Sequence, residues 1–254
     1  MKLDSISPLV GMVEKLALYA PVSVEDRVGL LELPYSSRFL EAGSYLLRDR
    51  DTPDQCGMLV SGLAYRHKVS VEGLRQIVSI YIPGEFYSLQ QLHLATADSN
   101  VQWLTRCEVV MISHEALRRL AAERFSVAQA LFATTIVELS MSREWMLNIG
   151  RRDARTRIAH LLCEFAFRLD KHSLPAGQAC ELPMTQEQLA DALGLTAVHV
   201  NRTLKVLVND GLIAYSKRGV TIPNWDMLVA KAGFNSGYLH MNLSDTTTHK
   251  PCHA

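Results

Sequence analysis

The stretch TQEQLADALGLTAVHVNRTLKVL, residues 185–207, constrains the fold of this chain more than any other. Thr185 followed three residues later by Gln188 forms a capping box, in which both side chains accept hydrogen bonds from backbone amides at the start of a helix. Gly194 can adopt the left-handed conformation that ends a helix, and Thr196 can cap a second helix directly afterwards. The stretch therefore predicts two helices joined by a very short turn.

The second predicted helix has two faces of different chemistry. Val200, Leu204 and Leu207 are spaced by four and three residues, so they form one apolar stripe that packs inward. No Asp or Glu occurs from residue 192 to residue 209, as is expected of a surface close to phosphates. This combination is typical of a helix-turn-helix, although an ordinary helical hairpin with solvated charges gives a similar pattern. The outer face and the helix starts supply the candidate DNA contacts, which are Val198, His199, Asn201 and Arg202 for bases and Thr185, Thr196 and Lys205 for phosphates.

Two short apolar runs follow the helix pair, and a basic turn separates them. Residues 211–215 and 220–223 therefore predict a small β-hairpin, or wing. Lys217 and Arg218 at its tip are candidate contacts to the DNA backbone, which give affinity without sequence information. The acid-free helix and the basic wing favour DNA binding over the alternative function, a ligand-binding module whose helix pair serves protein–protein interaction.

Residues 152–162, RDARTRIAHLL, together with the helix pair and the wing, resemble the DNA-binding domain of the Crp/Fnr family of bacterial transcription regulators. The resemblance continues upstream in MLVSG at 58–62, RQI at 75–77, PGEF at 83–86 and CEV at 107–109. It implies an α+β chain with an N-terminal double-stranded β-roll of the jelly-roll type, a long dimerisation helix and a C-terminal winged helix-turn-helix. The implied function is transcription regulation by a homodimer that binds palindromic promoter sites on double-stranded DNA and contacts RNA polymerase.

The pattern along the chain agrees with this order of elements. Residues 9–20 and 24–33 have helical apolar spacing and are split at Pro21. From residue 38 to residue 113, short β-rich runs alternate with turns, which suggests a sandwich or barrel. The expected strands are 45–47, 57–60, 63–69, 76–82 and 107–112, with a hairpin turn at 70–73. The expected divisions are a cyclic-nucleotide-binding-like sensor roll at 1–113, a dimerisation helix at 114–149, a DNA-binding domain at 150–223, and a C-terminal helix and flexible tail at 224–254.

Finer boundaries are expected in the carboxyl half. They are a hinge at 150–153, a backing helix at 154–169, a loop at 175–181, a short helix at 225–231 and a disordered polar tail from 244. Phe234, Tyr238 and Leu239 are expected to pack against the core.

The region 114–149 has helical spacing with few helix breakers. Its semi-apolar stripe follows a spacing of three and four residues and needs a partner. The stripe can pack against the chain's own β-roll or, as the resemblance implies, against its twin across a two-fold axis. A symmetric pair of reading helices would fit two half-sites about one turn of DNA apart. The residues expected in the dimer interface are Ala128, Phe132, Thr135, Ile136, Leu139, Ser142 and Met146.

The effector is expected to differ from cyclic AMP. Family members that bind cyclic AMP carry a glycine–glutamate pair for the ribose and an arginine–serine pair for the phosphate after the PGEF-like run. Here residues 87–91 read YSLQQ and residues 97–100 read ADSN, so an aspartate stands where a buried phosphate needs an arginine. Polar loop residues that can line a pocket for an unidentified effector, if they are not simply solvated, are Glu85, Tyr87, Ser88, Asp98, Ser99 and Asn100.

The resemblance also bears on base recognition. Family members read a guanine with an arginine, and the matching residue is Arg202. The family's glutamate, which reads a neighbouring base, is replaced by Val198. A valine cannot accept a hydrogen bond from cytosine but can touch a thymine methyl group, so we expect the recognised site to depart from the usual family site.

Composition excludes several other functions. The net charge is zero, but residues 1–149 carry 14 basic and 17 acidic residues, whereas residues 150–223 carry 10 basic and 7 acidic ones. The five cysteines are scattered, with Cys180 the best candidate for a redox-sensitive thiol, and His67, His93 and His114 lack ligand spacing, so no metal or cofactor is expected. No nucleophile motif or phosphate-binding loop appears, so we expect no catalytic residues and no enzyme activity. Neither a signal peptide nor an apolar run of about 20 residues occurs, which predicts a cytoplasmic protein without membrane contact.

Overall fold

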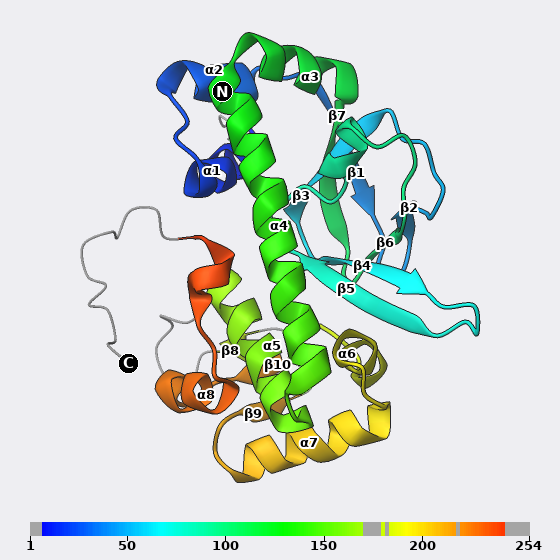
Figure 1. Ribbon diagram of the computed structural model, residues 1–254, viewed down its shortest axis with the longest axis vertical. Coiled ribbons are helices and arrows are strands. Elements are labelled where there is room, and N and C mark those ends of the chain that lie inside the picture. The colour runs from blue at the N-terminus through cyan, green and yellow to red at the C-terminus, as the bar shows by residue number, and fades with distance from the viewer. Residues whose placement is uncertain (1–6, 170–178, 181–182, 217–218, 242–254) are drawn as a thin grey trace, which may run out of the picture.

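The computed structural model describes residues 7–169, 179–180, 183–216 and 219–241 (Figure 1). The long helix α4 runs through the centre of the molecule, with two sheets on one side and a helical unit at its carboxyl end (Figure 1). The expected α+β fold class is confirmed.

Two short helices precede the sheets, as expected. They are α1 (Val10–Tyr19) and α2 (Val24–Leu31). Ser23 begins α2 with a capping box, because its hydroxyl accepts from the Asp26 amide while the Asp26 carboxylate accepts from the Ser23 amide.

The β-roll consists of two antiparallel sheets. One has the strand order β1-β7-β3 and the other β2-β6-β4-β5. The strands are β1 (Tyr35–Leu40), β2 (Tyr45–Leu47), β3 (Gln55–Ser61), β4 (Ala64–Val69), β5 (Arg75–Tyr81), β6 (Asn100–Trp103) and β7 (Cys107–Ser113). Leu59, Val101 and Val109 are fully buried between the sheets.

Five of these strands were predicted within a few residues, and two were missed. Strand β1 was missed because nearly all of its side chains are exposed, so the sequence shows no alternation of apolar and polar residues. Strand β6 was missed because it begins at Asn100, which the sequence analysis assigned to a polar loop. The hairpin turn at 70–73 is confirmed, since the Ser70 amide donates to the Leu74 carbonyl and Gly73 has a φ of +82°.

The single helix expected at 114–149 is wrong. The structure has α3 (His114–Glu123) and α4 (Phe125–Arg151), separated at Arg124, whose backbone is extended. Helix α3 packs on β7 while α4 packs on α1, and one straight helix could not reach both. The expected hinge at 150–153 is also too long, because α4 continues to Arg151 and Asp153 already caps the next helix.

The elements after α4 form what we call the C-terminal unit. It contains α5 (Ala154–Arg168), β8 (Ala179–Cys180), α6 (Gln186–Leu193), α7 (Ala197–Asn209), β9 (Ala214–Ser216), β10 (Gly219–Thr221), α8 (Trp225–Ala232) and the 3-10 helix η2 (Ser236–Leu239). The strands form a small sheet in the order β8-β10-β9. Part of the loop expected at 175–181 is therefore strand β8, while the rest of that loop, Lys217, Arg218 and the tail from 244 lie outside the described residues.

The C-terminal unit and the β-roll share one continuous apolar core. Leu189, Leu193 and Val200 of the C-terminal unit belong to the same buried cluster as Ile77 and Ile80 of β5. Phe234 and Leu239 are buried in that cluster, and Tyr238 packs against it, as predicted. The position of α6 and α7 is therefore tied to the β-roll by packing as well as by the covalent link.

Candidate nucleic-acid interface

The start of α6 has the geometry that its sequence predicts. The Thr185 hydroxyl accepts from the Gln188 amide at 3.1 Å, and the Gln188 side-chain oxygen accepts from the Thr185 amide at 2.8 Å. The Thr185 side chain is exposed and keeps its own hydroxyl hydrogen as a free donor. It can therefore cap the helix and still donate to a phosphate oxygen.

Gly194 fixes the turn between α6 and α7. It has a φ of +62°, and a Cβ atom there would lie 3.2 Å from Cγ2 of Ile149. Arg157 on α5 donates to the carbonyl oxygen of Leu193 at 2.9 Å, which satisfies one of the unpaired carbonyls at the end of α6. Thr196 then caps α7 by accepting from the His199 amide. The two helices are thus held at a fixed angle by the turn and by α5.

Helix α7 presents the predicted outer face to solvent (Figure 1). Val198 is 81% exposed, and Arg202 and Lys205 are exposed beside it. Val200 and Leu207 on the opposite side are fully buried, so the face cannot rotate away without exposing the core. Two cations and an apolar side chain are therefore displayed on one face of α7.

His199 and Asn201 are held more tightly than the sequence suggested. Asn201 donates to the Gln186 side chain at 3.1 Å, which links α7 to the first turn of α6. His199 is half-buried, and its carbonyl accepts from the Thr203 hydroxyl. Of the four predicted base-reading residues, Val198 and Arg202 are exposed, whereas His199 and Asn201 are partly covered.

Arg155 is a residue of this region that sequence reasoning missed. It lies on α5 and forms an ion pair with Asp210, which caps the end of α7. The pair fixes the carboxyl end of α7 as the Asn201 contact fixes its amino half. Its only signal in the sequence is the basic cluster at residues 151–157.

Three of the six residues predicted to line an effector pocket make contacts within the β-roll itself. The Tyr87 ring is buried against Gly57, where a Cβ atom would lie 1.7 Å from the phenol oxygen, and Ser88 accepts from the Gly57 amide. Asn100 accepts from the Asp49 amide at the start of β6. Tyr87, Ser88 and Asn100 therefore pack in the core or satisfy backbone donors within the β-roll.

The side chain of Arg66 lies beside Asp98 and Ser99. Its guanidinium is buried and donates to the Ser99 hydroxyl at 2.7 Å, to the Tyr81 hydroxyl at 2.7 Å and to the Tyr87 carbonyl at 2.6 Å. The Asp98 carboxylate lies 3.9 Å from the Arg66 guanidinium, so the negative charge of Asp98 is partly compensated. The sequence around Arg66 reads AYRHKV, and three consecutive basic side chains in this run give no sign that Arg66 is buried.

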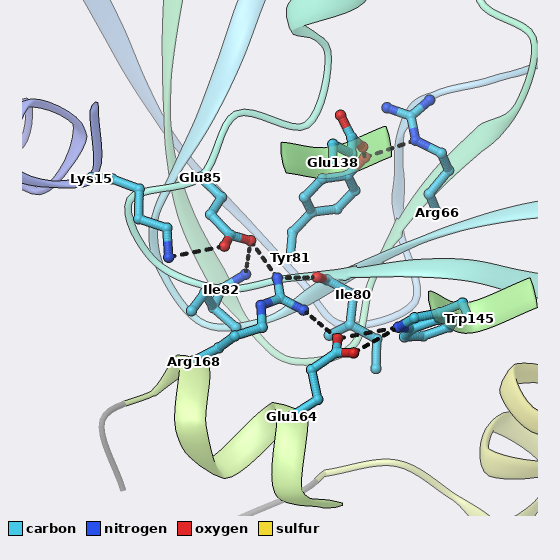
Figure 2. A network of polar contacts seen from close by, with 10 residues as sticks. All are labelled: Lys15, Arg66, Ile80, Tyr81, Ile82, Glu85, Glu138, Trp145, Glu164 and Arg168. Atoms are coloured by element: carbon cyan, nitrogen blue, oxygen red, sulfur yellow. Dashed lines mark hydrogen bonds and ion pairs between the residues drawn. The ribbon is translucent and has the colours of Figure 1, made fainter. Parts of the chain in front are cut away.

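Glu85, the acid of the PGEF motif, faces a different neighbour. It pairs with Lys15 of α1 at 3.1 Å and with Arg168 of α5 at 2.7 Å (Figure 2). Burial alone would raise the pKa of the Glu85 carboxyl, but the positive charges of Arg168 and Lys15 outweigh it and lower that pKa. Glu85 is therefore a charged group at the boundary between the β-roll and the C-terminal unit.

Arg168 continues this network into the C-terminal unit. Its second nitrogen pairs with Glu164 at 3.2 Å, and the Glu164 carboxylate accepts from the Trp145 indole (Figure 2). The same carboxylate accepts from the Tyr238 hydroxyl at 2.7 Å. The burial of Arg168 would lower its pKa, but Glu85 and Glu164 raise it, so it stays charged. A chain of buried polar contacts thus joins α1, the β-roll, α4, α5 and η2.

The predicted dimer stripe lies on the surface of α4. None of its seven residues is buried, and Phe132, Ile136, Leu139 and Met146 are between 43% and 72% exposed. The opposite side of α4 buries Val127, Ala130 and Leu131 against the protein. The stripe is therefore an unpaired apolar surface along a helix of 27 residues.

The cysteines and histidines do not gather into a site within the described part of the chain. Burial raises the pKa of the Cys56 and Cys163 thiols to about 12, so both are protonated at neutral pH. The described residues hold no group of three or more His, Cys, Asp or Glu side chains that could bind a metal ion. The side chain of Cys180 lies outside the described residues.

Comparison with known families covers both halves of the chain. The cyclic nucleotide-binding domain model matches residues 37–124, and the Crp-like helix-turn-helix domain model matches residues 156–231. The chain is 30% identical to the transcriptional activator protein FnrL of Cereibacter sphaeroides over 224 residues, which cover 87% of this chain and 89% of FnrL. It is 29% identical to the nitrogen fixation regulation protein FixK of Bradyrhizobium diazoefficiens over 201 residues, which cover 78% of this chain and 83% of FixK.

A solved structure supports the same fold. The structure of FixK2 from Bradyrhizobium japonicum superposes with a TM-score of 0.71 at 24% sequence identity and covers 78% of this chain and 97% of FixK2. The arrangement of β-roll, long helix and C-terminal unit is therefore shared with that protein.

Proposed function

The chain belongs to the Crp/Fnr family of DNA-binding transcription regulators, and from this premise we propose that it reads palindromic promoter sites as a homodimer, with α7 in the major groove. The observation that carries the proposal is the acid-free outer face of α7. This face presents Val198, Arg202 and Lys205 on a helix whose inner side is locked into the core. We assign the protein no catalytic role.

The contacts divide into those that read bases and those that hold the backbone. Arg202 makes a bidentate contact to a guanine, and Val198 touches a thymine methyl group at a neighbouring position. His199 and Asn201 lie beside them as further polar contacts. Lys205, the hydroxyls of Thr185 and Thr196, and the wing residues Lys217 and Arg218 contact phosphates, which position the protein without reading sequence.

The dimer forms through the stripe on α4. The stripe borders an apolar hollow of about 470 Å³ between η1 (Leu89–Leu92), α3 and α4, which Ala128, Phe132 and Thr135 help to line. Side chains of a second copy can enter this hollow beside the stripe.

By length and composition alone, α4 could also cross a membrane. We assign its apolar surface to the dimer interface instead. In this proposal the protein works in the cytoplasm without membrane contact.

The signal is a group or molecule other than cyclic AMP. Three of the five N–H groups of Arg66 donate to Ser99, Tyr81 and the Tyr87 carbonyl, so this buried guanidinium is engaged within the β-roll and is not a free fork for a phosphate.

Selection of bound sequences from a random DNA pool, with and without cell extract, tests the proposal. We expect a palindrome with a guanine opposite Arg202 in each half. A titration of the selected duplex at two salt concentrations separates DNA binding from the alternative, in which the helix pair binds another protein, because only DNA binding has a steep salt dependence. Failure to enrich any sequence under both conditions contradicts the proposal.

A further inference from the structure

Strand β5 of the β-roll touches the C-terminal unit at both of its ends. At its start, Nε of Arg75 lies 2.6 Å from Oδ2 of Asp191 on α6, and the Gln76 side chain donates to the Ala192 carbonyl at 3.4 Å. At its other end, the Ile80 carbonyl accepts from Arg168 of α5 at 2.7 Å. One strand therefore holds both α6 and α5.

The two contacts differ in burial. The side chains of Arg168 and Glu85 are 3% and 13% exposed, whereas those of Arg75 and Asp191 are 31% and 25% exposed. Opening the first contact would leave charges in a dry site, which is costly, while water can solvate both groups of the second when it opens. The first contact is suited to a fixed point, and the second can form and break at low cost.

A contact that fixes α6 also fixes α7, which carries the proposed base-reading residues. The Asn201 side chain of α7 donates to the Gln186 side chain of α6, and a short turn at Gly194 joins the two helices. With Arg75 and Asp191 in contact, Val198 and Arg202 remain exposed on the far side of the pair. The contact with β5 and the contact with DNA can therefore exist together.

We propose that Arg168 is a fixed pivot and that the Arg75–Asp191 pair is a reversible latch, which aligns α7 so that both copies can occupy two half-sites together. This inference rests on the proposed function. When the latch is closed, α7 is presented to the second half-site in the correct orientation. The closed latch therefore raises the effective concentration for the second binding event. When the latch is open, α7 binds one half-site normally, but simultaneous binding to both half-sites has an additional ordering cost.

The latch is also connected to the interior of the β-roll. Arg75 donates to the Tyr65 hydroxyl at 3.2 Å, and that hydroxyl contacts the Gln102 side chain on β6. A change in the spacing of β4 and β6 would therefore move a group that Arg75 contacts. A structural change inside the β-roll can therefore be transmitted to the Arg75–Asp191 pair.

The test compares two duplexes with five forms of the protein: the wild type, three single variants and one double variant. The duplexes are the palindrome recovered by selection and the same palindrome with one half scrambled, and binding is measured by fluorescence anisotropy. We expect Arg75→Ala and Asp191→Asn each to weaken binding to the palindrome by about three- to tenfold, with binding to the single half-site unchanged. Arg106→Ala, which breaks the exposed pair with Glu41 inside the β-roll, is the matched control and should change neither.

Charge effects and latching predict different outcomes. Arg75→Ala removes a positive charge and Asp191→Asn removes a negative one, so a purely electrostatic effect on DNA would have opposite signs in the two variants. A latch predicts losses in both, and the swapped double variant Arg75→Asp with Asp191→Arg should recover part of the affinity. Opposite signs, equal losses on both duplexes, or no change in either variant would overturn the inference.

Hydrogen exchange separates this inference from the proposed function. If the wild-type protein binds no duplex, the proposed function fails, but the latch can still be read from the amides of α6 in the intact protein without DNA. We expect faster exchange there in Asp191→Asn than in Arg106→Ala. Equal exchange in the two variants would contradict the latch whatever the DNA result.

Discussion

Nη2 of Arg168 lies 2.7 Å from Oε2 of Glu85 and also donates to the Ile80 carbonyl at 2.7 Å. One guanidinium of the C-terminal unit therefore holds both sides of the turn that ends β5 (Figure 2). Since the acid comes from the β-roll and the base from α5, the pair joins the two halves of the chain into one body at this point.

The first prediction concerns the stability of this body. Glu85→Gln should lower the free energy of unfolding by about 3 to 5 kcal/mol, because it leaves the charges of Arg168 and Lys15 buried without their shared partner. Urea denaturation followed by circular dichroism measures the change. The control Arg106→Ala loses an ion pair whose side chains are 71% and 79% exposed, and should cost less than about 1 kcal/mol. Similar losses in both variants would show that the buried network is not a major source of stability.

The second prediction separates base reading from backbone contact. Arg202→Ala should remove about 1 to 3 kcal/mol of discrimination at one base pair, because it deletes a bidentate contact to guanine. Lys205→Ala should instead weaken binding to all sequences alike and reduce the salt dependence by about one charge. Titrations of the selected site and of a scrambled duplex measure both effects. If Lys205→Ala changed the preferred base, the assignment of the two residues would be wrong.

The third prediction concerns the stripe on α4. Leu139→Glu should shift the protein from dimer to monomer, because it places a charge in an apolar seam where its own copy lies across the two-fold axis. Leu139→Met keeps the seam apolar and should remain dimeric. Sedimentation velocity at micromolar concentration distinguishes the two. A dimeric Leu139→Glu would place the interface elsewhere.

The fourth prediction concerns pH. Burial and the charge of Arg75 lower the pKa of His67 from 6.5 to about 4. Between these values the unfolded chain binds a proton that the folded protein does not, so His67 contributes stability above pH 6.5 that is lost as the pH falls toward 4. His67→Leu should therefore lose less stability than the wild type between about pH 7.5 and about pH 5, as measured by urea midpoints.

His93 provides the matched control for this effect. Its side chain is exposed, so His93→Leu makes the same side-chain change outside the buried core. If His67→Leu had the same slope as His93→Leu, the buried imidazole of His67 would not be the group that titrates.

Local patterns determined the helix-turn-helix and its caps. Thr185, Gly194 and Thr196 took the roles that their sequence positions predict, because capping and left-handed turns depend on atoms only a few residues apart. The inward stripe of α7 was predicted for the same reason, since helical periodicity alone decides which residues share a face. The long stripe on α4 was likewise visible in the sequence, although the break at Arg124 was not.

Only the tertiary structure decided which charges meet. Glu85 and Arg168 are 83 residues apart, Arg75 and Asp191 are 116 apart, and nothing in the local sequence around any of the four residues indicates a partner. Arg66 likewise gains its neighbours from strands that the fold brings together. The sequence by itself determined the local elements and the acid-free reading face, because short-range geometry governs them. The links between the β-roll and the reading helix depend on packing between distant segments, so only the folded chain could reveal them.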